Sequence, residues 1–142
     1  MLKVLIALSA SALVGTFINL AFAEGEYFQN KIRPFSTDGC SRFPDGLPFF
    51  DDNKWRKCCV IHDIAYWQGG TEEDRHFADK TLRECVAQAG ESEIAFAMYI
   101  GVRIGGYIGL PTTWRWGYGW TINREYKPLN LYEKMQVQAE LE

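Results

Sequence analysis

Apolar residues recur at helical spacing along three successive stretches of the chain, and glycines separate these stretches. The first stretch predicts a helix from about Asp52 to Gln68, where Gly69 and Gly70 would stop it. The second stretch begins after Thr71, which has the position of an N-cap in a capping box. Because the link between the two predicted helices is so short, we expect them to be antiparallel neighbours.

A third helix is expected from Glu93 to about Gly109, and it is apolar on most faces. Small residues fall at every fourth position of this helix, namely Ala97, Gly101, Gly105 and Gly109. A stripe of this kind lets another backbone approach closely, so we expect tight packing on the first two helices. The same stripe could pair helices in a membrane, but Arg103 and the glycines argue against a span in lipid.

The segment after the third helix is rich in large aromatic residues. Between Trp114 and Trp120 they alternate with arginine and glycine, which would place them on one face of an extended strip. We expect an aromatic flap that covers a small core, and the alternative is a surface that meets a membrane or stacks on a ligand. The tail, residues 130–142, predicts a short and weakly amphipathic helix, with Glu133 three positions after Asn130.

The N-terminal stretch has the features of an export signal. Lys3 is followed by an uncharged apolar run that ends Ala21-Phe22-Ala23, so residues 1–23 are expected to be a signal peptide and residues 24–142 a single domain. The alternative is a retained membrane anchor. The net charge is −3, and removal of the leader makes the mature chain one unit more negative. This acidic balance argues against a nucleic-acid partner.

An exported chain with four cysteines is expected to hold two disulfides. Neighbouring residues on a helix point in different directions, so a bond between Cys58 and Cys59 is geometrically poor. Two pairings remain open. One joins Cys40 to Cys59 and Cys58 to Cys85, and the other joins Cys40 to Cys58 and Cys59 to Cys85. Either pairing ties a loop and the second helix to the first helix.

His62 is the histidine whose neighbours suggest chemistry. It shares a helix face with Cys58 and Tyr66, and Asp63 follows it directly. The other histidine, His76, lies among charged residues on a helix face that should be solvated, and we assign it no role. The plainest alternative is that His62 and Asp63 only make structural contacts in a small secreted domain.

An acid on the second helix is a candidate partner for this histidine. If Cys58 pairs with Cys85, an antiparallel register brings Asp79 close to His62. A carboxylate on the edge of an apolar stripe needs a partner, and an imidazole N–H can serve as one. The result would be a base held in place by an acid, as in many hydrolases.

Asp63 suggests a metal site. Calcium favours hard oxygen ligands, and the loop over 39–46, held close through Cys40, can offer backbone carbonyls beside the carboxylate of Asp63. The competing interpretation is a zinc site. It would use the side chains of Cys58, Cys59, Cys85 and His62. Adjacent thiols on one helix do not easily share a tetrahedral centre, which disfavours zinc.

The run Cys58-Cys59-x-x-His62-Asp63-x-x-Tyr66 resembles the active-site helix of secreted phospholipases A2. The segment from Ala78-Asp79-Lys80 to Cys85 resembles the second helix of that family, and the short link between the helices is similar to that of compact prokaryotic members. The resemblance covers about residues 38–88. It implies the first of the two open pairings, Cys40–Cys59 with Cys58–Cys85.

The resemblance also implies an activity, the calcium-dependent hydrolysis of the sn-2 ester of glycerophospholipids. His62 would activate water, Asp79 would orient His62, and Tyr66 would form a hydrogen bond near Asp79. The Ca²⁺ ligands would be the carboxylate of Asp63 and backbone carbonyls at Gly39, Ser41 and Phe43. The loop departs from the family pattern, because bulky residues follow Cys40 where the family has glycines, and Asp45 is an alternative side-chain ligand.

The sequence therefore predicts a mainly α fold. It consists of a disulfide-linked antiparallel helix pair with an N-terminal metal loop and an additional packed helix. We expect a monomeric enzyme, secreted or periplasmic, whose partner is a phospholipid membrane surface. The alternative is a catalytically weak phospholipase A2-like module that binds a membrane or a protein.

Overall fold

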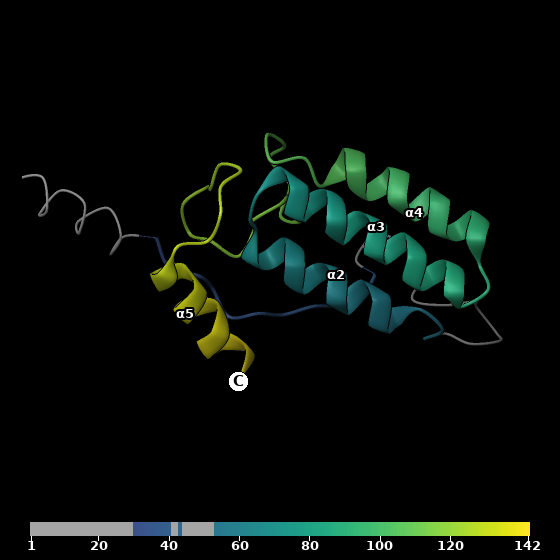
Figure 1. Cartoon of the computed structure of the whole chain (residues 1–142), viewed down its shortest axis with the longest axis horizontal. Coiled ribbons are helices and arrows are strands. Elements are labelled where there is room, and N and C mark those ends of the chain that lie inside the picture. The colour runs from purple at the N-terminus through teal and green to yellow at the C-terminus, as the bar shows by residue number, and fades with distance from the viewer. Residues whose placement is uncertain (1–29, 41–42, 44–52) are drawn as a thin grey trace, which may run out of the picture. The chain divides into compact units, whose positions relative to one another are not determined.

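The computed structural model describes residues 30–40, 43 and 53–142. The predicted signal peptide and its membrane-anchor alternative, together with Ser41 and Asp45, fall on positions outside the described residues. The chain divides into two units, residues 1–31 and residues 32–142, and the account below concerns the second unit. Four α-helices occur in its described part (Figure 1): α2 Arg56–Gln68, α3 Glu72–Gln88, α4 Ser92–Gly105 and α5 Leu131–Leu141.

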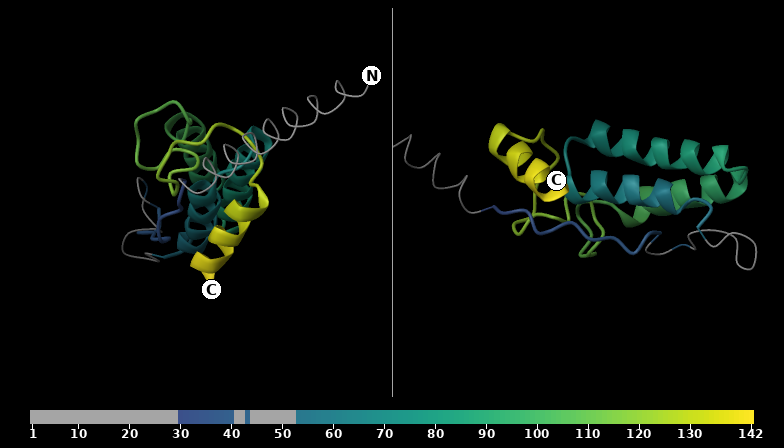
Figure 2. Two further views of the ribbon diagram at one scale, coloured as in Figure 1. Left: turned by 90° about the vertical axis from the view of Figure 1, so that its left-hand side faces the viewer. Right: turned by 90° about the horizontal axis from the view of Figure 1, so that it is seen from below.

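The mainly α class is confirmed for the described part of the chain. Its only β feature is an isolated antiparallel bridge between Ile32 and Trp120. Helix α3 packs against both α2 and α4, and Figures 1 and 2 show α2 and α3 side by side. In none of the described ranges is there a helix that is both long and apolar enough to cross a membrane.

Helix α2 begins later than expected and ends where expected. The residues before it, 53–55, form a turn, and Trp55 occupies the N-cap position without a side-chain hydrogen bond. The helix ends at Gln68 because Gly69 adopts a φ of 68°, a conformation that favours glycine. The backbone N–H of Gly69 still donates to the carbonyl of Ala65, so the last turn is closed.

Two of the helices start with the capping boxes that the sequence indicates. In α3 the Thr71 side chain accepts from the backbone N–H of Asp74, and the Asp74 carboxylate accepts from the backbone N–H of Thr71. In α5 the same reciprocal pair forms between Asn130 and Glu133. Each box supplies partners for backbone donors that the helix itself leaves unpaired.

Helix α4 ends at Gly105, four residues before the predicted end at Gly109. The carbonyl of Gly106 accepts from the backbone N–H of Trp116, which belongs to the aromatic segment. The chain then turns, and the N–H of Leu110 donates to the carbonyl of Tyr107. The carbonyl after the last helical residue is thus paired with the aromatic segment, a contact that the helical periodicity could not indicate.

The main core lies among α2, α3 and α4. It is built from buried side chains that include both cysteines of the double-cysteine run: Trp55, Cys58, Cys59, Leu82, Val86, Ala95 and Met98. Disulfides join Cys40 to Cys59 and Cys58 to Cys85, which confirms one of the two open pairings. All four cysteines are thereby used, so the zinc interpretation is wrong.

A second cluster connects α5 to the N-terminal strand-like segment and to α2. Val137 of α5 packs with Ile32, Trp67 and Trp120, which are all buried. Trp116 is also buried and belongs to a third cluster with Tyr66 and Ala78. The aromatic segment therefore covers the core, as expected, although it runs through turns and is not an extended strip.

The prediction that the small-residue stripe packs tightly on the first two helices is wrong. A Cβ atom on Gly101 would meet nothing within 4 Å, and on Gly105 it would meet only Trp114 Nε1, at 3.5 Å. The close approach occurs instead at Gly106, where a Cβ would lie 2.3 Å from the ring of Tyr66. Spacing alone does not distinguish a stripe that packs from one that faces open space.

These two glycines offer a matched test of packing. Gly106→Ala should lower the free energy of unfolding by about 1–3 kcal/mol, because the new methyl overlaps the buried Tyr66. Gly101→Ala should raise the free energy of unfolding by about 0.5–1 kcal/mol, because alanine is the better helix residue and has room. Urea denaturation measures both, and equal effects would contradict the packing at Gly106.

Candidate functional site

His62, Asp79 and Tyr66 meet in the interior between α2 and α3. The Nε2–H of His62 donates to Asp79 Oδ1 at 2.9 Å, and the Tyr66 hydroxyl donates to the same oxygen at 2.8 Å. All three side chains are buried, and Asp79 is 0% exposed. The structure thus brings the three predicted catalytic residues together, and it leaves Nδ1 as the imidazole nitrogen that does not face Asp79.

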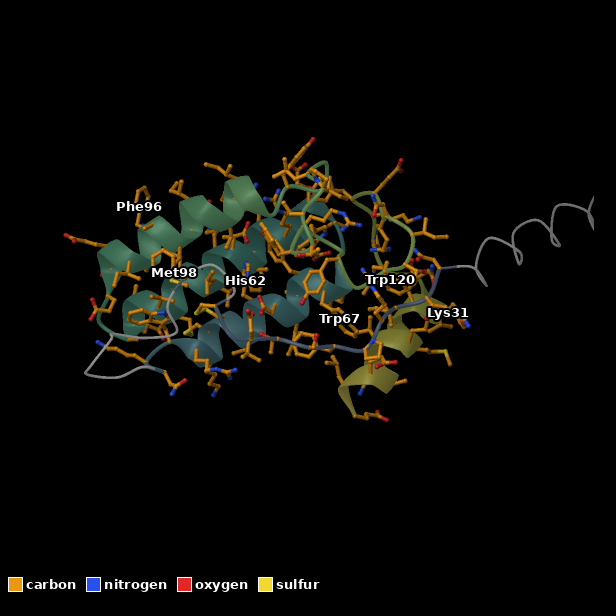
Figure 3. All side chains as sticks on the ribbon, turned by 180° about the vertical axis from the view of Figure 1, so that it is seen from behind. Lys31, His62, Trp67, Phe96, Met98 and Trp120 are labelled. Carbon is orange, nitrogen blue, oxygen red and sulfur yellow. A yellow bond between two sulfur atoms is a disulfide. The ribbon has the colours of Figure 1, made fainter. Side chains whose placement is uncertain are left out.

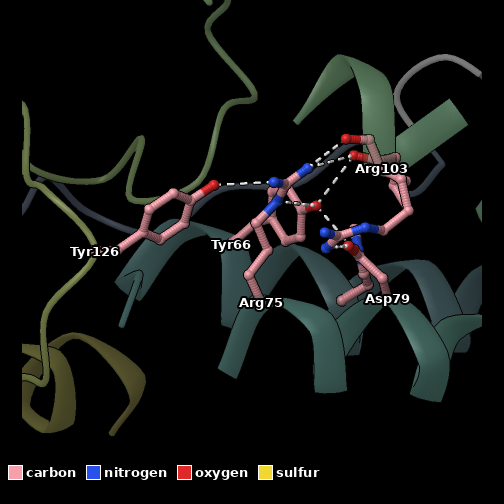
Figure 4. Close-up of polar contacts among 7 residues, drawn as sticks. Tyr66, Arg75, Asp79, Arg103 and Tyr126 are labelled. Carbon is pink, nitrogen blue, oxygen red and sulfur yellow. Dashed lines mark hydrogen bonds and ion pairs between the residues drawn. The ribbon is translucent and has the colours of Figure 1, made fainter. Parts of the chain in front are cut away.

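Two arginines complete this polar cluster, and sequence reasoning gave them no role. Arg103 Nη1 donates to the other carboxylate oxygen of Asp79, Oδ2, at 2.8 Å (Figure 4). Arg75 is 2% exposed and donates from Nε to the Tyr66 hydroxyl at 3.2 Å. Its other nitrogens donate to the Tyr126 hydroxyl and to the carbonyls of Val102 and Arg103. A buried cation with this many acceptors holds α4 and the C-terminal segment to α3.

The cluster sets the protonation states of its members. Burial by itself would raise the pKa of Asp79, but hydrogen bonds from His62, Arg103 and Tyr66 outweigh burial and hold that pKa below its ordinary value of 3.8. Burial and the negative charge of Asp79 raise the pKa of the Tyr66 phenol. Asp79 is therefore a carboxylate at neutral pH, and Tyr66 keeps the proton that it donates.

His62 and Asp63 both line one cavity of about 940 Å³. One wall is α4, which contributes small and apolar side chains: Ala97, Met98, Gly101, Val102 and Gly105. The cavity is also lined by Ser36, Thr37, Asp38, Cys40 and Phe43 of the N-terminal segment and by Trp114 and Tyr118 of the aromatic segment. The volume lies within the range of small-molecule sites, roughly 300–1,000 Å³. The small-residue stripe of α4 thus lines a cavity beside the histidine.

Asp63 is connected to the predicted metal loop through Thr37. The Thr37 hydroxyl donates to Asp63 Oδ2 at 2.6 Å and accepts from the backbone N–H of Gly39 at 3.0 Å. Gly39 has a φ of 92°, in the left-handed region that favours glycine. Phe43 lines the cavity, and its backbone N–H donates to the carbonyl of Cys40 at 2.8 Å. The loop and Asp63 are therefore neighbours, as the disulfide at Cys40 leads one to expect.

A second carboxylate lies in this region. Burial raises the pKa of the Tyr118 phenol, and the negative charges of Asp63 and Asp38 raise it further, so both carboxylates act on one hydroxyl. Sequence reasoning did not assign Asp38 as a ligand. Its position directly before Gly39, next to the loop expected to bind metal, is the signal that could have indicated it.

The oxygen groups at this place fit the chemistry of calcium. Carboxylates of Asp63 and Asp38 and the backbone of a loop bent at Gly39 are hard donors, the kind that Ca²⁺ prefers. Within the described ranges no cluster of three or more His, Cys, Asp or Glu side chains is placed to hold a metal. Calcium bound here would therefore depend on backbone carbonyls as well as on the two carboxylates.

Comparisons with protein-family models, with curated proteins and with solved structures find no match to this chain. The resemblance to secreted phospholipases A2 therefore stays a prediction from the motif residues of the sequence.

The lowered pKa of Asp79 predicts how stability depends on pH. The ionised carboxylate of Asp79 contributes its full stabilisation of the folded state above pH 3.8, the ordinary pKa of the group. This contribution is lost as the pH falls through the lower pKa that Asp79 has in the folded protein. Wild-type protein should therefore lose free energy of unfolding on acidification, and Asp79→Asn should lose clearly less. Urea denaturation at neutral and acidic pH measures the difference. Glu84→Gln, which removes an exposed acid from the same helix, should behave like the wild type.

Proposed function

We propose that this protein is a calcium-dependent hydrolase of the sn-2 ester of glycerophospholipids, related to the secreted phospholipases A2. The observation that carries the proposal is the 2.9 Å hydrogen bond from His62 Nε2 to the buried carboxylate of Asp79, in the wall of a cavity that Asp63 also lines. A histidine oriented by a carboxylate is the arrangement of a general base.

The contacts between α2 and α3 support the related fold. Cys58 pairs with Cys85, and His62 pairs with Asp79. Residue numbers on α3 therefore fall as the numbers of their partners on α2 rise. This order supports the antiparallel helix pair. The disulfide between Cys40 and Cys59 attaches the loop beside Asp63, which supports the N-terminal metal loop.

In the proposed reaction each of these side chains has a part in hydrolysis. His62 takes a proton from water at Nδ1 while Nε2–H stays bonded to Asp79, and the hydroxide adds to the ester carbonyl. When the carbon–oxygen bond to the glycerol breaks, His62 returns the proton to the leaving alkoxide, which gives a lysophospholipid and a fatty acid. Calcium, held by Asp63 and loop carbonyls, would supply positive charge that stabilises the oxyanion.

Hydrolysis should require calcium and His62. We expect a phospholipid with a labelled sn-2 chain to release labelled fatty acid with Ca²⁺ and to release none with a chelator. His62→Gln should lower kcat by about 10²–10⁴-fold, because the general base is lost. His76→Gln is the matched control, since it changes the other histidine, which is exposed on α3, and it should keep wild-type activity.

The same assay decides between the enzyme and the alternative, a catalytically weak module that only binds. Asp63→Asn should raise the calcium concentration needed for half-maximal activity by at least about tenfold, because it removes a charged ligand. Wild-type protein that binds phospholipid vesicles and releases no fatty acid would support the alternative and contradict the enzyme.

The exposed face of α4 supports a phospholipid surface as the partner. Large apolar side chains at four-residue steps form an exposed ridge on α4. The ridge consists of Phe96, Ile100 and Ile104, which are 53%, 41% and 68% exposed. Figure 3 shows Phe96 pointing outward from α4 and Met98 pointing toward the other helices. The small residues next to this ridge line the cavity that holds His62, so a lipid could pass from the ridge to the histidine. Exposed apolar side chains in a row suit the acyl region of a membrane, and Arg83, which lies over the ring of Phe96, could meet a lipid phosphate.

Membrane binding should depend on this ridge. Ile104→Ser should weaken binding to phosphatidylcholine vesicles by about tenfold, because it removes one large apolar side chain from the contact. Phe77→Ser, which changes an apolar residue of α3 that is 72% exposed, should bind as the wild type does. Vesicle sedimentation measures both, and equal losses would contradict a specific role for α4. Both variants should hydrolyse a short-chain monomeric phospholipid at the wild-type rate.

A further inference from the structure

Arg103 stands out because it is the only arginine or lysine bonded to the carboxylate of Asp79 within the described part of the chain. Its Nη1 lies 2.8 Å from Oδ2, whereas His62 and Tyr66 both donate to Oδ1. A carboxylate that is 0% exposed requires compensation for its lost hydration. His62 and Tyr66 supply part of it through hydrogen bonds to Oδ1, and the guanidinium of Arg103 supplies a permanent positive charge at Oδ2.

The division of donors between the two oxygens has a consequence for geometry. The carboxylate of an aspartate can rotate about its Cβ–Cγ bond, and this rotation would move Oδ1 of Asp79 away from the imidazole of His62. Arg103 holds Oδ2 from the side of α4, so Oδ1 stays directed at His62 Nε2. The orientation of the imidazole then depends on a residue of a third helix.

We propose that Arg103 is a positioning residue of the hydrolytic site, which acts on His62 through Asp79; this inference rests on the proposed function. Arg103 is not one of the residues that line the cavity, and its guanidinium is bonded to Asp79. Its effect passes along a chain of three side chains, from the guanidinium to the carboxylate to the imidazole. Residues that orient a reacting group in this way commonly change activity by about 10–100-fold.

Arg75 holds the backbone of α4 at Arg103. Arg75 donates to the backbone carbonyls of Arg103, at 2.6 Å, and of Val102, at 3.2 Å (Figure 4). The last turn of α4 is thereby fixed to α3, next to Asp79. A cation in the last turn of a helix also interacts favourably with the helix dipole, but that interaction would not direct the guanidinium to Asp79.

The test compares Arg103→Gln and Arg103→Lys with the wild type on a monomeric phospholipid in the presence of Ca²⁺. Arg103→Gln should lower kcat by about 10–100-fold and change KM by less than about threefold, because orientation is lost and the cavity is unchanged. Arg103→Lys keeps the cation but loses the planar fork of donors, so its kcat should lie about 3–10-fold below that of the wild type, above that of Arg103→Gln. Arg83→Gln is the matched control, because Arg83 lies over the rings of Phe96 and Tyr99, outside the cluster, and it should keep wild-type kcat.

A double-mutant cycle with Asp79→Asn separates positioning from a general effect on the fold. In that background Arg103→Gln should cost less than about twofold in kcat, because the carboxylate on which Arg103 acts is gone. An equal cost in both backgrounds would overturn the proposal, and so would Arg103→Gln with wild-type kcat. If Arg103→Gln does not fold, Arg103→Lys decides: a kcat reduced by about 3–10-fold at unchanged KM supports positioning, and wild-type kcat overturns it.

The activity of the wild-type protein distinguishes failure of the proposed function from failure of the role of Arg103. A wild-type protein that releases no fatty acid with Ca²⁺ would overturn the hydrolase and, with it, the role of Arg103. An active wild type whose Arg103→Gln variant is equally active would overturn the role of Arg103 alone.

Discussion

The buried carboxylate of Asp79 is the constraint on which the arrangement of the helices depends. It lies on α3 with 0% exposure and receives hydrogen bonds from α2, through His62 and Tyr66, and from α4, through Arg103. Removing one partner of a buried ion pair leaves an uncompensated charge, at a cost of about 3–5 kcal/mol. The three helices therefore keep a common register at this point, and the same register gives the imidazole its orientation.

Packing and chemistry coincide at Tyr66. Its ring occupies the space that a side chain at position 106 would fill, and its hydroxyl links Arg75 to Asp79. The disulfide between Cys58 and Cys85 joins α2 to α3 on one side of the cluster, and the Gly69–Thr71 link joins them on the other. The proposed site is thus built on the most constrained part of the helix pair, which suits a group whose orientation matters.

Helix α4 has two apolar faces with different surroundings. The face with Ala97 and Gly101 lines the cavity beside His62, and the neighbouring ridge with Phe96 and Ile104 is exposed. A helix of this composition would ordinarily bury more of its surface, yet only Ala95 and Met98 are buried. The aromatic segment that follows takes the place of a further helix over the core, with Trp116 and Trp120 buried.

The sequence by itself determined what depends on neighbours within a few positions. The helix starts at Thr71 and Asn130 and the stop at Gly69 follow from local hydrogen bonds and backbone preference, so short motifs indicate them. The meeting of His62 and Asp79 could also be anticipated, because one disulfide and helical spacing relate the two positions. Only the tertiary structure decided that Arg103 and Arg75 join this pair and that Asp38 lines the same cavity as Asp63. Only the tertiary structure, too, showed that the stripe at Gly101 faces a cavity. These features arise where segments distant in the chain are packed together, and the spacing of residues within one helix carries no information about which segment lies opposite it.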